Sequence, residues 1–388
     1  MNFAELKAIE QENILRSYGR VDVALDHGKN AEAWDVEGKH YFDFTSGIGV
    51  NALGYSDDGW VKAVSEQAAK IQHMSNYYYA EPNIRLAQAL SEASGMARAF
   101  FCNSGAEANE CAIKIARRHG EAKGAWKIVT LENSFHGRTL TTLAATGQDS
   151  FHQYFLPLTD GFVYVPGNDL GALEKAVDET VCAVMVESVQ GEGGVIPMEE
   201  EYLRGVRKLC DSKGILMILD EVQTGVGRTG HFFSYQGAGV QPDVVTAAKA
   251  LAGGLPYAAC LVNAGLKDIF SPGMNGSTFG GNPVASAGAL EVVTRVNTPE
   301  FLAEVREKGA YFVEKLREMK NVGEIRGRGL MIGIEVKGQD AHEVLVECAK
   351  QGLLILTAKD MVRFLPPLTI TKAEIDGGLA IFKTVIGG

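Results

Sequence analysis

Lys249 is the residue whose surroundings point most directly to chemistry. It lies in PDVVTAAKALAGGLP, residues 242–256, where it follows an apolar run and has small residues on both sides. That setting leaves room for a bulky group at the lysine nitrogen, and burial lowers the pKa of an amine, which makes it nucleophilic towards an aldehyde. A lone lysine is more often a surface residue, but surface lysines rarely end an apolar strand among glycines and alanines. The segment therefore favours a covalent role for Lys249.

Asp220 is a second candidate, at the end of the apolar run in GILMILDEVQTGVGRTG, residues 214–230. A carboxylate at the end of a buried strand is costly unless it meets a cation. A protonated pyridine nitrogen would be such a cation, and the carboxylate would keep that ring charged as an electron sink. A structural carboxylate bound by loop amides is the alternative for this segment alone.

A third candidate is an anion site in NSGAEANECAIKIARRHG, residues 103–120. Ser104 and Glu107 predict a capping box at the start of a helix, and Gly120 can end that helix. Free backbone N–H groups and the helix dipole favour a phosphate at such an N-terminus. An ordinary capped helix is the alternative when the segment is considered alone.

Other motifs argue against several classes of protein. The glycines of GVGRTG spell GxGxxG, but they do not directly follow the strand, because the four residues EVQT intervene, which disfavours NAD. The chain has no P-loop, no GxSxG and no HExxH. A formal net charge of −11 argues against a nucleic-acid partner.

The helices and strands expected around these residues predict an α/β fold. From about residue 97 to 262, helical patterns alternate with the β-rich runs ARAFFCN, KIVTLE, FVYVP, CAVMVE, ILMILD, DVVTAA and AACLV. Such alternation predicts βα units around a buried, mostly parallel sheet, with ligands at the carboxyl ends of its strands.

The two ends of the chain are expected to form a smaller α+β domain. Amphipathic stretches near 299–319 and 371–386 bracket the strand-like segments GLMIGIEV and VRFLPPL, and the N-terminal segments AEAWDVEG and HYFDF can join them. We expect residues 51–285 to form the large domain, and residues 1–50 and 286–388 the small one.

Cysteine usage and the N-terminus indicate the compartment. The six cysteines lie far apart with neither CxxC nor zinc-type spacing, which predicts reduced thiols and no metal site. The first twenty residues lack the apolar core of a signal peptide, and no stretch reaches 18 apolar residues. We therefore expect a cytoplasmic protein without a membrane segment.

Together these segments resemble the class III aminotransferases, which depend on pyridoxal 5′-phosphate (PLP). The resemblance covers nearly the whole chain and rests on the joint spacing of SGAEANE, FHGRT, ESVQGEGG, DEVQTGVGRTG, AAKALAGG and STFGGNP. It implies the fold type I of PLP-dependent transferases and a homodimer with two shared active sites. Short length, SGIGVNALG and GSTFGGNP are most similar to bacterial members that transfer an amino group from N2-acetylornithine to 2-oxoglutarate in arginine biosynthesis.

The resemblance also implies how the cofactor is held. Lys249 would bind PLP as a Schiff base and, once displaced by substrate, carry protons as a general acid and base. Asp220 would pair with the pyridine nitrogen, and Gln223 would lie near the ring hydroxyl. The other implied cofactor contacts are Phe135 on the ring face, Ser104, Gly105 and Ala106 at the phosphate, and Thr278 from the neighbouring subunit.

Substrate contacts are implied in the same way. Arg138, in FHGRT, matches the arginine that binds a substrate carboxylate, and Arg363, in VRFLPP, matches the arginine that binds the α-carboxylate of glutamate. Glu192, in QGEGG, matches the glutamate that neutralises Arg363 when the other substrate is bound. Tyr18 and Ser277 are the remaining implied substrate contacts.

Several alternatives stay open at this stage. Residues 55–58 are YSDD where the family usually has a His-rich turn, and Ser188 stands where proline is common. Succinylornithine, N-succinyl-diaminopimelate, ornithine and 4-aminobutyrate are rival amino donors, although Ile48 disfavours free ornithine. Amino-aldehyde mutase chemistry is an alternative on the same fold. A noncatalytic or nucleotide-binding protein is the alternative from another class.

Overall fold

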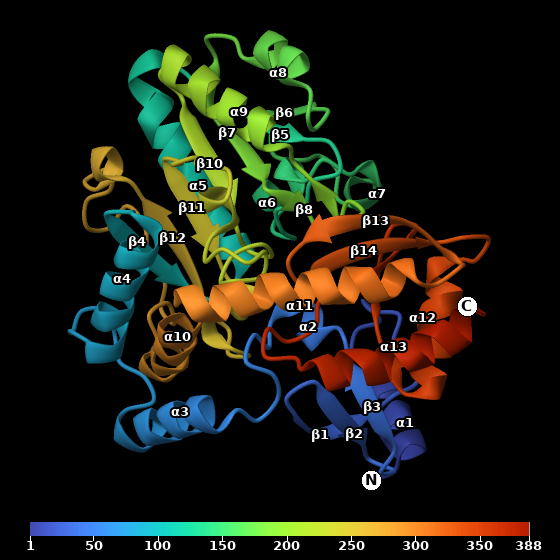
Figure 1. The fold of residues 1–388 in the computed structure, drawn as a ribbon. Coiled ribbons are helices and arrows are strands. Elements are labelled where there is room, and N and C mark those ends of the chain that lie inside the picture. Colours follow the sequence, from blue (N-terminus) through green and yellow to red (C-terminus); the bar gives the residue numbers. More distant parts are fainter. Residues whose placement is uncertain (388) are drawn as a thin grey trace.

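A seven-stranded sheet forms the centre of the molecule, and the computed structural model describes residues 1–387 (Figure 1). Its strand order is β4-β12-β11-β10-β7-β5-β6. Strand β12 runs antiparallel to both of its neighbours, and the other adjacent pairs are parallel. The strands are β4 (Arg98–Cys102), β5 (Lys127–Leu131), β6 (Phe162–Val165), β7 (Val181–Glu187), β10 (Leu216–Asp220), β11 (Val244–Ala247) and β12 (Ala258–Val262). All seven predicted strands are present, which confirms the mostly parallel α/β class.

Helices cover both faces of this sheet. Along β7, successive side chains point to opposite faces. Val184 packs in the core that includes Leu203 of α9 (Glu200–Lys213), and Met185 packs in the core that includes Ile115 of α5 (Gly105–Gly120). Burial on both faces explains why the strands read as nearly continuous apolar runs.

Residues 1–387 form thirteen α-helices, of which α11 and α13 pack against strands of the smaller sheets, and α10 packs against α3 and α4. Among residues 1–387, none of them combines the length and the apolar character needed to cross a lipid bilayer. They are α1 (Phe3–Asn13), α2 (Ser46–Gly49), α3 (Asp58–Lys70), α4 (Glu81–Ser94), α5 (Gly105–Gly120), α6 (Leu140–Ala145), α7 (Asp149–His152), α8 (Leu170–Ala176), α9 (Glu200–Lys213), α10 (Pro283–Val296), α11 (Pro299–Arg317), α12 (Ala341–Gln351) and α13 (Lys372–Ile386).

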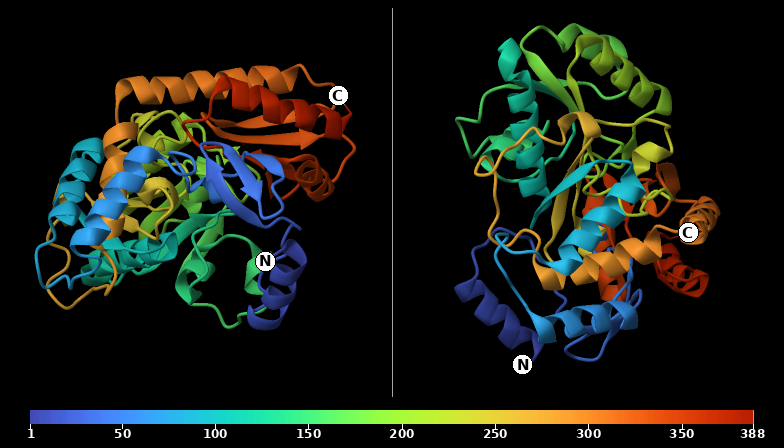
Figure 2. Two further views of the ribbon diagram at one scale, coloured as in Figure 1. Left: turned by 90° about the horizontal axis from the view of Figure 1, so that it is seen from below. Right: turned by 90° about the vertical axis from the view of Figure 1, so that its left-hand side faces the viewer.

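The two ends of the chain meet in two four-stranded sheets, of order β1-β2-β3-β15 and β13-β14-β17-β16. Strand β15 pairs parallel with β3, so a C-terminal strand completes the N-terminal sheet. Figure 2 shows the N-terminal strands beside the C-terminal elements. The strands are β1 (Leu25–Lys29), β2 (Glu32–Asp35), β3 (His40–Asp43), β13 (Val322–Arg328), β14 (Met331–Val336), β15 (Leu353–Leu354), β16 (Leu356–Ala358) and β17 (Met361–Phe364), and a separate hairpin is formed by β8 (Val189–Gln190) and β9 (Ile196–Pro197).

The sequence predicted one small layer, whereas the structure has two sheets there. The chain changes partner at Ile355, since β15 pairs with β3 and β16 pairs with β17. The residues on either side of Ile355, Leu354 and Leu356, are both apolar, so the sequence gives no sign of the change of partner.

Candidate active site

A cavity of about 410 Å³ opens at the carboxyl ends of the central strands. Strands β7, β10 and β11 end side by side there, because Asp220 pairs in register with Glu187 on one side and with Thr246 on the other. Most of the predicted site residues line this cavity: Ser104, Gly105, Ala106, Phe135, Arg138, Glu192, Asp220, Gln223 and Lys249.

Lys249 reaches the cavity from the segment that follows β11. It begins a short 3₁₀ helix, η3 (Lys249–Ala252), with φ of 43°. This left-handed conformation costs a residue other than glycine about 1 kcal/mol or more, so the surrounding structure must hold it there. Burial lowers the pKa of the Lys249 amine below its ordinary value, against the opposing charge of Glu192. The amine makes no hydrogen bond to any residue from 1 to 387, which leaves it free for a ligand.

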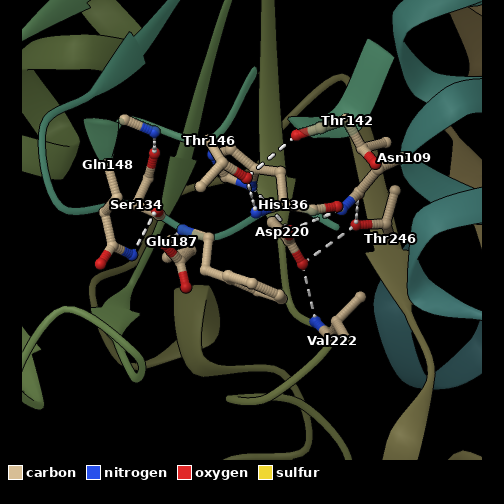
Figure 3. A network of polar contacts seen from close by, with 12 residues as sticks. Asn109, Ser134, His136, Thr142, Thr146, Gln148, Glu187, Asp220, Val222 and Thr246 are labelled. Carbon is tan, nitrogen blue, oxygen red and sulfur yellow. Dashed lines mark hydrogen bonds and ion pairs between the residues drawn. The ribbon is translucent and has the colours of Figure 1, made fainter. Parts of the chain in front are cut away.

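Asp220 is held by donors on both of its oxygens (Figure 3). Oδ2 accepts from Asn109 Nδ2 and faces His136 Nδ1, each at 2.8 Å. Oδ1 accepts from the backbone N–H of Val222 at 3.0 Å and from the hydroxyl of Thr246 at 3.4 Å. The carboxylate is only 3% exposed, and these four partners fix its position beside the cavity.

The network around Asp220 contains residues that the sequence analysis did not single out. The amide of Asn109 also donates to the backbone oxygen of His136 at 2.7 Å, and the backbone N–H of His136 donates to Thr146 Oγ1 at 3.0 Å. His136 and Asn109 lie within the quoted motifs FHGRT and SGAEANE. The first motif comes after β5 and the second after β4, and this placement was the sequence signal that could have indicated both residues. Their partner is 84 and 111 positions away in the chain, which no local pattern reveals.

Glu187 was also not predicted as part of the site. It ends β7, lines the cavity and accepts the backbone N–H of Phe135 at 3.0 Å. Burial first, and then the charge of Asp220, raise the pKa of the Glu187 carboxyl well above its ordinary value. The two neighbouring carboxyls therefore differ in their hydrogen bonding. Asp220 has partners on both oxygens, whereas Glu187 accepts one backbone N–H.

The N-terminus of α5 points its free amides at the cavity. The Ser104 hydroxyl accepts the N–H of Glu107 at 3.2 Å, as predicted, but the Glu107 carboxylate binds the N–H of Asn103 at 2.6 Å instead of that of Ser104. The predicted capping box is therefore only half formed. Within the described chain, the N–H groups of Ser104, Gly105 and Ala106 have no acceptor, so they can bind an oxyanion.

Arg363 and Glu192 form a closed ion pair beside the cavity. Arg363, on β17, is 2% exposed and binds Glu192 Oε1 through Nη1 at 2.7 Å and Oε2 through Nη2 at 3.3 Å. Gln223 joins both residues, because it donates to Glu192 at 3.1 Å and accepts from Arg363 at 3.1 Å. Burial alone would raise the pKa of Glu192, but Arg363 and Lys249 outweigh it and bring the pKa down to about 2.

The depressed pKa of Glu192 predicts a pH-dependent contribution to stability. The ordinary pKa is 4.5, so the contribution is complete above that pH and is lost as pH falls towards 2. Between pH 5.5 and 3.5 the difference in unfolding free energy between the wild type and Glu192→Gln should shrink by about 1 kcal/mol. Urea unfolding at the two pH values measures it. Glu174→Gln, an exposed carboxyl on α8, is the control and should show no such change, and a constant difference for Glu192→Gln would contradict the pairing.

Phe135 and Arg138 lie at the side of the cavity next to α7. The guanidinium carbon of Arg138 lies 4.1 Å from the ring centre of Phe151 and 5.4 Å from that of Phe135. Phe135 meets Phe151 edge to face, with ring centres 5.8 Å apart. Arg138 is exposed and lines the cavity, so its guanidinium is accessible to a carboxylate from solvent.

Three predicted residues are not brought to this cavity within one chain. Ser277 and Thr278 line a separate cavity of about 820 Å³, although the Ser277 hydroxyl accepts from Asn103 at 3.3 Å and Asn103 lines the Lys249 cavity. Tyr18 is 76% exposed in the segment between α1 and β1, where its ring meets Arg20. The roles of these three residues stay predictions.

The comparisons with known proteins agree with this geometry. Residues 14–386 match the family described as aminotransferase class III, and the chain belongs to that family. An acetylornithine aminotransferase from Haemophilus ducreyi is 47% identical over 100% of this chain and 99% of the relative. A succinylornithine transaminase from Yersinia pseudotuberculosis is 44% identical over 95% of this chain and 93% of the relative. A crystal structure of ornithine aminotransferase from Toxoplasma gondii has a TM-score of 0.94, with 32% identity over 100% of this chain and 95% of that one.

Family membership confirms four predictions from the sequence. The chain is a class III aminotransferase, it has the α/β fold of PLP-dependent transferases, it is a transaminase, and its cofactor is pyridoxal phosphate. The cavity suits that cofactor, because it combines an amine without a partner among residues 1–387, a buried carboxyl fixed by hydrogen bonds and free helix-terminal amides.

Proposed function

We propose that this enzyme transfers the side-chain amino group of N2-acetylornithine to 2-oxoglutarate, as a step of arginine biosynthesis. The observation that carries the proposal is the single cavity in which Lys249, Asp220 and the N-terminus of α5 meet. Bound there, pyridoxal phosphate supplies an aldehyde to take up the amino group and a protonated ring to accept electrons. Full-length relatives with this activity support the choice of substrate.

Each side chain of the site then has a defined task. Lys249 would hold the cofactor through its amine and would move a proton at the substrate carbon, for which a lowered pKa is suited. Asp220 holds the ring nitrogen positive, and Gln223 lies near the ring hydroxyl. Phe135 contacts the ring face, while the amides of residues 104–106 bind the phosphate.

The Arg363–Glu192 pair is proposed to select between the two substrates. Glutamate and 2-oxoglutarate carry an α-carboxylate that Arg363 can bind only when Glu192 moves away, and the closed pair neutralises Arg363 when acetylornithine is bound. Arg138 binds a carboxylate in either half-reaction, since it stays exposed to the cavity.

Replacing Arg363 with alanine is expected to slow the glutamate half-reaction about a hundredfold and the acetylornithine half-reaction much less. The loss corresponds to removing a buried charged hydrogen bond to the α-carboxylate. Single-turnover absorbance measurements of each half-reaction give the two rates. Arg85→Ala, on the exposed face of α4, is the control and should change neither rate. Equal losses in both half-reactions would argue against the switch.

Dimerisation is proposed because exposed aromatic residues lie at the cavity of Thr278 and at the cavity next to it. Tyr77 is 95% exposed and lines the first of these cavities, and Phe279 is 62% exposed and packs against His73. Large exposed aromatic patches mark association sites. A second subunit seated there would bring Ser277 and Thr278 to the neighbouring active site, so catalysis would require the dimer.

The domain division and the compartment are proposed on other grounds. Residues 51–285 would form the large domain, and residues 1–50 and 286–388 the small one, where residue 388 lies outside the described residues. The cytoplasm is the proposed compartment, because all six cysteines are free and buried, as a reducing environment favours.

A panel of amino donors at saturating 2-oxoglutarate tests the substrate proposal. We expect the highest kcat/KM for N2-acetylornithine, with ornithine, 4-aminobutyrate and N-succinyl-diaminopimelate far below it. Succinylornithine is the second candidate, favoured by the relative of that activity. A higher kcat/KM for succinylornithine or another donor would overturn the choice of acetylornithine.

A further inference from the structure

Four arginine side chains line a second cleft, which shares no lining residue with the candidate active site. The cleft has a volume of about 550 Å³ and lies between α11, β13 and the segment 229–237. In Figure 1, α11 runs alongside β13 and β14. Helix α11 contributes Arg306 and Arg317, and strand β13 contributes Arg326 and Arg328.

The lining of this cleft carries an excess of positive charge. Its only carboxyl among the described residues is Glu200, which lies 3.4 Å from Arg204 outside the lining. Arg326 is paired with Glu324, which leaves the other three lining arginines without a carboxylate partner in the described chain. A cationic cleft in a protein with a formal net charge of −11 is a local feature that the average composition does not explain.

These arginines also keep N–H groups available. Arg317 makes no hydrogen bond or ion pair with the rest of the described chain. Arg306 uses one nitrogen for the backbone oxygen of Gly230, and Arg328 uses one for that of Met198. A guanidinium has five N–H donors, so most of them remain free to bind an anion in forked geometry.

Two further features point to a polar ligand. Thr229 and Ser234 line the cleft, are 6% and 2% exposed, and their hydroxyls have no partner in the part of the chain described. A buried hydroxyl without a partner is costly, and a bound ligand or its ordered water would remove that cost. Burial, followed by the charges of Arg306 and Arg328, lowers the pKa of His231 in the same lining.

We propose that this cleft is a second binding site, separate from transamination, for a small organic anion with at least two negative charges. Phosphate and carboxylate groups share the planar or branched oxygen arrangement that arginine forks bind. The volume is that of a site for a small molecule and exceeds what a single inorganic ion needs. The ligand would contact elements far apart in sequence, from residue 229 to residue 328.

Calorimetric titration of the enzyme tests this site. Fructose 1,6-bisphosphate and citrate serve as probes at low ionic strength. The enzyme is first saturated with pyridoxal phosphate and then freed of unbound cofactor, so that the catalytic cavity is filled and no free phosphate ester competes for the cleft. We expect binding of one probe molecule per chain. Arg317→Gln should weaken it about fivefold, because one charged hydrogen bond is lost. Arg85→Gln changes the net charge by the same amount on α4 and should bind as the wild type does.

The double variant Arg306→Gln/Arg317→Gln should weaken binding further, to less than about a twentieth of the wild-type affinity. The circular dichroism and transaminase activity of this variant should equal those of the wild type, which shows that the fold and the active site are intact. Loss of probe binding is then distinguished from loss of the proposed catalytic function. The two probes distinguish phosphate from carboxylate ligands, and binding of either supports the site. Absence of binding by both probes, or equal weakening by Arg85→Gln, would overturn the proposal.

Discussion

Replacing Lys249 with alanine is expected to lower turnover by at least about ten-thousandfold. The loss combines the missing covalent link with the missing general acid and base, which by itself contributes about a hundred- to ten-thousandfold. The lysine amine has no protein partner within the described chain, so its removal should leave the fold nearly unchanged. Turnover of the purified variant with acetylornithine and 2-oxoglutarate measures the effect, and the visible absorbance of the bound cofactor should shift or disappear.

Lys208→Ala is the matched control for this variant. Lys208 is exposed on α9, far from the cavity lining, and its loss should leave both turnover and absorbance unchanged. Turnover of Lys249→Ala within tenfold of the wild type would show that another group carries the proton transfer.

Replacing Asp220 with asparagine is expected to lower kcat about a thousandfold. In the role proposed for it, Asp220 keeps the ring nitrogen positive, which a neutral amide of the same shape would not do, so the cofactor would lose its capacity to accept electrons. In the wild type, Asn109 Nδ2 donates to the carboxylate and His136 Nδ1 faces it, each at 2.8 Å. The amide of the variant would present N–H groups to these two nitrogens. Steady-state kinetics give kcat, and cofactor absorbance shows whether binding is retained.

Glu187→Gln is the informative comparison for Asp220→Asn. Burial raises the pKa of the Glu187 carboxyl, which favours its neutral form, so a neutral amide of the same shape is a smaller electrostatic change here than at Asp220. We expect a loss of at most about tenfold for this variant. A loss as large as that of Asp220→Asn would mean that the carboxyl that pairs with the ring nitrogen had been assigned to the wrong residue.

Much of the fold followed from the sequence because its signals are local. Each strand of the central sheet is a short apolar run, and the parallel arrangement places the residues after those runs at one edge. Lys249, Asp220 and Ser104 were found in this way, and the structure brings all three to one cavity.

Other parts of the site depend on contacts between distant segments. Neither His136 nor Asn109 has an unusual neighbour in sequence, yet both bind Asp220. The pairing of Arg363 with Glu192 spans 171 positions and was inferred only through the family resemblance. Strand pairing at the chain ends was incompletely predicted for the same reason, since β3 finds its partner more than 300 residues later.

The most direct test of the account is borohydride reduction of the enzyme loaded with pyridoxal phosphate, followed by peptide mapping. The reduced cofactor should be found on one peptide, with the modification on Lys249, and the reduced enzyme should be inactive. Modification of a different lysine under these conditions, or an active enzyme with no modified lysine, would contradict the assignment of Lys249.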